Sequence, residues 1–257
     1  MILFLLAFLT VIVLAVLYKL FQYLFLNKAA YASHKSFAAL KIEYAAHYFK
    51  SQGAFLLFAS VATFLLYKLL PWLLDYKLSF ISDSIFVIKS GKDMCLATSL
   101  FSGLFVATIA TFMLAKRQLQ ENYPEYLAYF SRRYRFDAVM ITKYTMGIYA
   151  VGVTALIIVF FGHYTIFGQK DIKIGKPFYV GTKTYKYSNV VSIKEVERLH
   201  APNGNIVNDP HYIIRFSDGG KWSSRDDGFE THELNTDVIN LIKANTHLQP
   251  VKVEFDE

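Results

Sequence analysis

One stretch of this chain limits its fold more than any other: residues 94–115 run for 22 positions without a charged side chain. As a helix, this stretch would measure about 33 Å at ~1.5 Å per residue, enough to cross a hydrocarbon core of roughly 30 Å. Three further apolar stretches accompany it, at 1–18, 53–74 and 146–167. The sequence therefore predicts a membrane α-helical bundle of four transmembrane helices over residues 1–167.

The composition of the chain agrees with a membrane-embedded first part. Hydrophobic residues make up 54% of the sequence and charged residues only 18%, which is too apolar for an ordinary soluble domain. Residues 1–167 contain 15 Lys and Arg against 7 Asp and Glu, whereas residues 168–257 contain 12 against 13. The basic excess therefore belongs to the segments between membrane helices, where it indicates orientation and predicts no nucleic-acid partner. Cys95 is the single cysteine, so no disulfide is expected within the chain.

Loop charges predict the orientation of the four helices. The segments 27–52 and 116–145 together carry ten Lys and Arg, whereas 75–93 carries three that three Asp residues offset. Short positively charged loops stay on the cytoplasmic side, so both basic segments are expected there. The N-terminal span lacks the charged start and the cleavage site of a signal peptide, and we expect it to be retained. Four spans then place the N-terminus and residues 168–257 outside, at the inner (plasma) membrane of a bacterium.

Both basic segments also carry helical patterns. Apolar and aromatic residues recur every three or four positions, at Phe37, Leu40, Tyr44 and Tyr48 in the first segment and at Tyr126, Phe130 and Tyr134 in the second. This spacing places each set on one helix face. We therefore expect helical cytoplasmic extensions of the membrane helices over 27–52 and 116–145.

A basic cluster of Arg132, Arg133 and Arg135 lies in the second of these segments. One interpretation is a contact with anionic lipid or with a partner. The other is a stop-transfer charge cluster whose neighbouring aromatic residues pack between helices. The sequence favours the second interpretation.

Small residues recur every four positions along the third span, at Ser99, Gly103, Ala107 and Thr111. Such a stripe lets helix backbones approach closely. The fourth span carries small residues in its first half, at Gly147, Ala150, Gly152, Thr154 and Ala155. These two spans are therefore expected to form the tight centre of the bundle. The pattern leaves open whether the contact lies within one chain or between copies in a homo-oligomer.

From Gly168 the hydrophobic pattern changes from long runs to alternation. Apolar residues alternate with polar ones in several short segments, of which 211–217 is the clearest, and this is typical of half-buried strands. Asn-Gly at 203–204 predicts a hairpin turn, and 235–246 has the pattern of a helix. The sequence therefore predicts a small α+β domain over 168–257, antiparallel and β-rich with one C-terminal helix.

This order of elements resembles the bacterial pleckstrin-homology-like domains attached to membrane helices, including those of the YcxB-like type. The matching stretch is about 171–248. It comprises an IKI strand, then YKYSNVVSI, YIIRFSDGGKW and the closing helix. The resemblance implies a two-sheet β-sandwich or barrel capped by a helix, which serves as a binding platform without catalysis. Two features depart from the family: the domain is net acidic without a clustered basic loop, and it is expected outside the cytoplasm.

Motifs for chemistry are missing from the sequence. The seven histidines show no metal-ligand spacing, and no P-loop, GxGxxG or GxSxG is present. Asp209, Asp218, Asp226 and Asp227 lie beside glycine or proline, where turn formation explains them. We therefore predict no catalytic residue, no metal and no cofactor, and the chain is not expected to be an enzyme.

Exclusion of these classes leaves binding as the predicted function. We expect a non-enzymatic integral membrane protein in the lipid bilayer whose β-rich domain binds a protein or a lipid headgroup. The alternatives are an immunity-type protein that protects the membrane or envelope against a toxin, and a small transporter or channel.

The best candidates for partner binding lie in two polar regions, 200–211 and 221–230. The residues singled out there are Asn203, Asn205, Trp222, Arg225, Asp226 and Asp227, because turns vary freely and Trp and Arg dominate interfaces. Trp222 has an equally supported alternative as a core residue.

Overall fold

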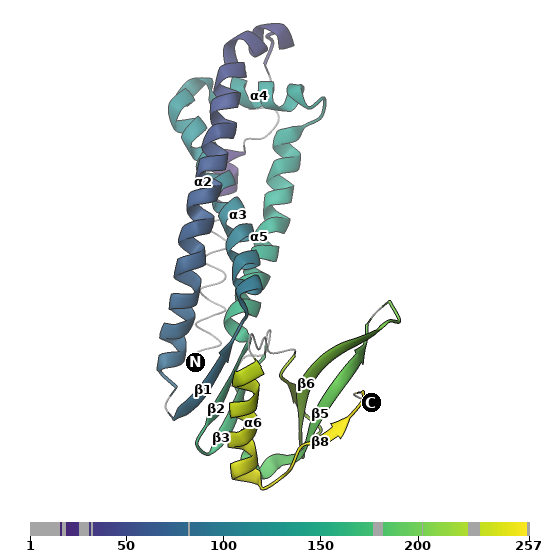
Figure 1. The fold of residues 1–257 in the computed structure, drawn as a ribbon. Helices are drawn as coiled ribbons and strands as arrows, with labels where there is room; N and C mark the ends of the chain where they lie inside the picture. Colours follow the sequence, from purple (N-terminus) through teal and green to yellow (C-terminus); the bar gives the residue numbers. More distant parts are fainter. Residues whose placement is uncertain are drawn as a thin grey trace. The chain divides into compact units, whose positions relative to one another are not determined.

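The structure is a computed structural model that describes residues 16, 19–25, 31, 33–81, 83–176, 182–201, 203–225 and 232–255. The chain divides into two compact units (Figure 1). The helical unit comprises Met1–Pro71 and Leu96–Leu156, and the β-rich unit comprises Trp72–Cys95 and Ile157–Glu257.

Three helical segments among the described residues are long and apolar enough to cross a membrane. They are α2 (Phe37–Ser79), Lys92–Arg133 and α5 (Ala138–Gly162). The second segment contains α3 (Lys92–Leu119), the short η2 (Gln120–Asn122) and α4 (Tyr123–Arg133). The prediction of helices with membrane-spanning length and composition is confirmed for these three. Residues 1–18, the predicted first span, lie outside the described residues apart from Val16, so a count of four is not established.

The described parts of both basic segments are largely helical, but only the second segment is interrupted. Residues 37–52 belong to the same helix as the apolar stretch that follows them. The segment 116–145 instead contains two breaks, at Gln120 with φ +46° and at Arg135 with φ +60°. Asp137 explains the restart of the helix after the second break, because its Oδ1 accepts a hydrogen bond from the backbone N–H of Met140 at 3.0 Å and so caps α5.

The β-rich unit contains two four-stranded sheets. The first has the order β1-β2-β3-β4, all antiparallel, with β1 at Ser84–Lys89, β2 at Tyr164–Gly168, β3 at Asp171–Gly175 and β4 at Thr182–Lys186. The second has the order β7-β6-β5-β8, with β5 at Val190–His200, β6 at Ile206–Phe216, β7 at Lys221–Ser223 and β8 at Val251–Val253. Only the β5–β8 pair in these sheets is parallel. The short η3 (Tyr187–Asn189) joins the sheets, and α6 (His232–Thr246) precedes β8.

One apolar core joins both sheets to α6. Its members include Phe167 of β2, Ile214 of β6 and Trp222 of β7, together with Val238, Ile239 and Ile242 of the helix. The indole Nε1 of Trp222 donates a hydrogen bond to Thr165 Oγ1 at 3.1 Å, which satisfies its polar atom inside the core. The predicted α+β character and the C-terminal helix are therefore confirmed.

The β-rich unit starts earlier in the chain than the sequence suggested. The segment 75–93, expected as a loop, contains β1, and the end of the predicted span 146–167 is β2 because α5 stops at Gly162. The correction has a simple cause: a buried strand and a buried helix both appear as continuous apolar runs, so hydropathy alone does not separate them. Tyr-Thr-Ile-Phe at 164–167 is rich in the aromatic and β-branched residues that favour strands.

Pairing of β1 with β2 agrees with three membrane crossings. Strand β1 follows α2 and precedes α3, whereas β2 follows α5. The two strands pair in register from Phe86 with Phe167 to Lys89 with Tyr164. Paired strands must lie on the same side of the membrane. The two helical segments between β1 and β2, Lys92–Arg133 and α5, must therefore either both cross the membrane or both not cross it. Both segments have the length and composition to cross.

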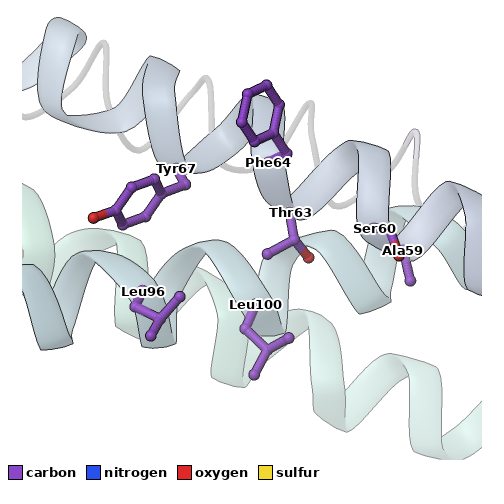
Figure 2. A pocket seen from close by; sticks show the side chains of 7 residues that line it. All are labelled: Ala59, Ser60, Thr63, Phe64, Tyr67, Leu96 and Leu100. Atoms are coloured by element: carbon purple, nitrogen blue, oxygen red, sulfur yellow. The ribbon is translucent and has the colours of Figure 1, made fainter.

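The stripe of small residues on α3 meets α2. Ser99 and Ala107 are fully buried, and a Cβ at Gly103 would lie 2.8 Å from the backbone N of Thr63 and 2.9 Å from its Cα. Figure 2 shows Thr63 of α2 above Leu100 of α3. Both residues line a groove with a volume of about 430 Å³. In the fourth span, Gly147 and Gly152 take no part in such a close contact, because a Cβ at either position would meet no atom within 4 Å, although Ala150 is buried and Tyr149 packs on Phe105 of α3. The close contact therefore lies within one chain.

Replacing Gly103 with Leu should destabilise the helical unit by about 1–3 kcal/mol, because any side chain there meets the backbone of α2. The free energy of unfolding in mixed detergent micelles measures the effect. Gly147→Leu is the matched control, since its site is open, and it should change that free energy by less than about 0.5 kcal/mol. Equal costs at the two positions would contradict the close α2–α3 contact.

Replacing Ile88 with Ala should destabilise the β-rich unit by about 2–5 kcal/mol, because Ile88 of β1 is 3% exposed and belongs to its core. The rate of trypsin cleavage after Arg215, which lies within β6, measures the effect in the intact protein. Ile85→Ala in the same strand is the control, because Ile85 is 44% exposed and its loss should leave the rate nearly unchanged. A domain that resists protease equally in both variants would show that β1 is dispensable.

Candidate binding groove in the C-terminal domain

The two regions predicted to bind a partner border one groove on the second sheet. This β-domain groove has a volume of about 250 Å³ and is lined by Arg198, Leu199, His200, His211, Ile213, Lys221, Ser223, Arg225 and Phe255. Strand pairing explains the convergence, since Ile213 of β6 lies opposite Ser223 of β7 and His211 lies opposite Val196 of β5. Residues about 25 positions apart in sequence therefore share one face of the sheet.

His211 and Arg225 are both held by Asp209. The backbone carbonyl of Asp209 lies 2.7 Å from Nδ1 of His211. A carbonyl only accepts, so Nδ1 of His211 is the donor in this hydrogen bond. The carboxylate of the same residue lies 3.0 Å from Nε of Arg225. One residue of β6 thus fixes two groove side chains.

The C-terminal segment forms the other wall. The backbone N–H of Arg198 donates to the carbonyl of Glu254 at 2.9 Å, and its Nη1 lies 2.9 Å from Oε1 of the same residue. This double attachment positions Phe255, whose ring stacks on His200 with centroids 4.4 Å apart and planes at 16°. The imidazole face therefore rests on an aromatic surface at the groove.

The groove has a positive lining. Arg198, Lys221 and Arg225 line it, and no Asp or Glu is among the described lining residues. The carboxylates of Glu254 and Asp209 pair with the two guanidinium groups from outside the lining. A volume of about 250 Å³ falls below the 300–1,000 Å³ of a typical small-molecule site. The groove therefore has the dimensions of one anionic side chain or headgroup.

Exposed apolar residues lie beside the groove. Ile206 is 56% exposed and Val207 is 43% exposed, and they pair with His200 and Leu199 at the end of the β5–β6 hairpin. Large aliphatic side chains at such exposure lose contact with water when a partner covers them. The combination of an apolar edge and basic side chains is typical of a protein interface.

The other residues predicted to bind a partner are not found in the lining of the groove. Trp222 is 2% exposed in the core, so it is not a surface contact, and the core alternative holds. Asn203 and Asn205 form the turn itself, with the N–H of Asn205 bonded to Asn203 Oδ1 at 3.1 Å. Asp226 and Asp227 lie outside the described residues. Of the predicted set, Arg225 alone lines the groove among the residues that the structure describes.

Arg198, Lys221 and Phe255 line the groove but were not among the predicted site residues. Arg198 lies beyond a β-bulge between Val196 and Arg198, which changes the register that simple alternation would give. Phe255 lies near the chain end, where no pattern predicted β8. Lys221 did lie within the second predicted region, but its pairing across β6 was needed to place it at the groove.

The predicted basic cluster belongs to the helical unit. Arg132 donates to the backbone carbonyls of Ser33 and Lys35, and Arg133 lies over the ring of Tyr48 with 4.4 Å from Cζ to the ring centroid. Arg135 is exposed. Within the described part of the chain, no three His, Cys, Asp or Glu side chains gather into a group that could hold a metal.

Comparisons of this chain with protein-family models, with curated proteins and with solved structures found no match.

Proposed function

We propose that this is a non-enzymatic integral membrane protein whose β-rich C-terminal domain binds a protein partner through the β-domain groove. The observation that carries the proposal is the convergence of Arg198, Lys221 and Arg225 around one small groove beside exposed Ile206 and Val207. The partner supplies an acidic side chain to the groove and apolar side chains to its edge. The two sheets and the C-terminal helix support the pleckstrin-homology-like character that we propose for the domain.

A protein partner fits the groove better than a lipid headgroup does. The exposed apolar residues lie next to the groove on a two-stranded hairpin, which presents a contact surface rather than a deep pocket. Both guanidinium groups are also held by carboxylates, which fixes their direction before a partner arrives. Side chains fixed in advance lose less conformational entropy on binding.

The proposed location is the inner membrane of a bacterium, with the β-rich domain outside the cytoplasm. The basic segments 27–52 and 116–145 lie at the ends of α2, α3 and α5 that are remote in sequence from β1 and β2. The positive-inside rule assigns those ends to the cytoplasm. Since β1 and β2 follow the opposite ends of α2 and α5, the β-rich domain is assigned to the outer side.

Cysteine labelling tests this orientation. In a Cys95→Ala background, Ser36→Cys should react only with reagent inside the cytoplasm and Asn203→Cys only with reagent outside, since both positions are exposed. The measurement is modification by a membrane-impermeant maleimide in intact cells and in inverted vesicles. Labelling of position 203 in inverted vesicles alone would place the domain in the cytoplasm and reject the proposed orientation.

Site-specific photo-crosslinking tests partner binding in the full-length protein in its native membrane. A photoreactive residue at Ile206 should capture a protein, whereas one at the exposed Ser188, on η3, should not. The double change Lys221→Gln with Arg225→Gln should abolish the crosslink. The exposed ion pair of Arg225 contributes no more than about 1 kcal/mol, so the domain should stay folded.

Lys186→Gln, an exposed charge change on β4, is the matched control and should leave the crosslink unchanged. Resistance to trypsin at Arg215, which lies within β6, shows that each variant is folded. A crosslink that survives loss of Lys221 and Arg225, or that Lys186→Gln weakens equally, would contradict recognition through the groove.

A further inference from the structure

A second groove lies in the helical unit, at the starts of α2 and α5 and the end of α4. This arginine groove has a volume of about 860 Å³. Its polar lining includes Arg132, Arg133, Arg135 and the carboxylate of Asp137, and its apolar lining includes Phe37 and Phe136. It is large enough for a phospholipid headgroup, since ligand sites commonly span 300–1,000 Å³.

Two of the three guanidinium groups are held in place by uncharged groups. Arg132 donates to the carbonyls of Ser33 and Lys35. Arg133 donates to the hydroxyl of Tyr129 at 3.2 Å while its guanidinium covers the ring of Tyr48. These contacts orient the side chains and leave their positive charge uncompensated. An arginine retains further N–H donors after two hydrogen bonds, because it has five.

Nearby carboxylates are engaged elsewhere. Glu43 and Glu125 both pair with Lys35, at 2.9 and 2.6 Å. Oδ1 of Asp137 accepts hydrogen bonds from Tyr31 at 2.5 Å, from Ser131 at 3.2 Å and from the N–H that it caps on α5.

Tyr31 can act only as the donor in its hydrogen bond to Asp137 while its hydroxyl is protonated. Burial, followed by the contact with Asp137, raises the pKa of Tyr31 far above its ordinary value, so it stays protonated. Among the described residues, none of the three arginines forms an ion pair with a carboxylate. The described lining therefore holds three cations and one carboxylate, that of Asp137, so the groove keeps an excess of two positive charges.

The start of α5 places this groove at the level of lipid headgroups. Its 25 residues extend about 37 Å at ~1.5 Å per residue, between the ~30 Å of the hydrocarbon core and the 40–45 Å that includes the headgroups. Asp137, which lines the groove, immediately precedes this helix. Met140, Ile141 and Tyr144 on its first turns are 50%, 51% and 61% exposed. Apolar side chains at this depth are available to acyl chains.

We propose that the arginine groove binds the phosphate of an anionic phospholipid, whose acyl chains lie along the exposed apolar residues at the start of α5. The guanidinium groups provide planar donors that match phosphate oxygens. Basic pockets between membrane helices bind anionic headgroups in this way. The site is independent of partner binding by the β-rich domain, and either proposal can fail without the other.

Native mass spectrometry of the purified full-length protein in detergent tests the proposal. Titration with dioleoyl phosphatidylglycerol should give a saturable adduct that phosphatidylcholine does not give at the same concentration. Arg135→Gln should weaken this adduct about fivefold, the change expected for one cation near a charged lipid surface. The exposed Arg135 side chain has no hydrogen-bond or ion-pair partner among the described residues, so the substitution should leave the fold intact.

Arg117→Gln is the matched control, because this exposed arginine on α3 does not line the groove. It should leave the affinity for phosphatidylglycerol unchanged. An equal loss in this variant would overturn the site in favour of general surface charge. Equal binding of phosphatidylcholine would show that charge is not recognised. Displacement of the lipid by inorganic phosphate at the lipid's own concentration would identify a site for a free anion and overturn the lipid assignment.

Discussion

The pairing of β1 with β2 is the interaction on which the architecture of the β-rich unit depends. Strand β1 contributes Ile88 to the core, and β2 contributes Phe167 and the hydroxyl that satisfies Trp222. Without these strands the first sheet would keep only β3 and β4, and a two-stranded sheet is marginal in water. The extramembrane domain is therefore built partly from the connection between two membrane helices, and its stability depends on that connection.

The two units hold their cationic side chains by different means. In the β-domain groove, carboxylates of Asp209 and Glu254 fix Arg225 and Arg198, so the directions of both guanidinium groups are set before an acidic side chain of a partner binds. In the arginine groove, carbonyls and aromatic rings fix Arg132 and Arg133, so the charge remains. The first arrangement suits recognition by shape and hydrogen bonding. The second suits electrostatic attraction of an anion that is abundant nearby.

Hydropathy and turn chemistry predicted the local elements well, because they act over a few residues. The apolar stretches at 53–74 and 94–115 are helical, Gly204 takes the positive φ expected of the hairpin, and the helix expected at 235–246 lies within α6. Such local patterns could not predict which strands pair when they lie far apart in the sequence. Nothing local shows that residues 84–89 join a sheet with residues 164–168.

In the candidate site, too, local residue type could be predicted from the sequence, whereas long-range strand pairing could not. Arg225 was identified by residue type, whereas Arg198 and Phe255 reach the groove through a β-bulge and through pairing of β8 with β5. Trp222, also chosen by type, is buried because it packs against Phe167 of β2 in the core between the sheets. Residue type thus suggests chemistry, but only the strand register decides which side of a sheet presents it.

The distance in sequence between β1 and β2 has a consequence for synthesis. Lys89 pairs with Tyr164, so β1 leaves the ribosome 75 residues before its partner. At roughly 5–20 residues per second this interval is about 4–15 s. During that time α3, α4 and α5 are made while an apolar strand edge stays unpaired, a state open to wrong pairing. Completion of the domain is thereby tied to insertion of the last membrane helix, so a chain that fails to insert α5 also exposes an unfinished sheet.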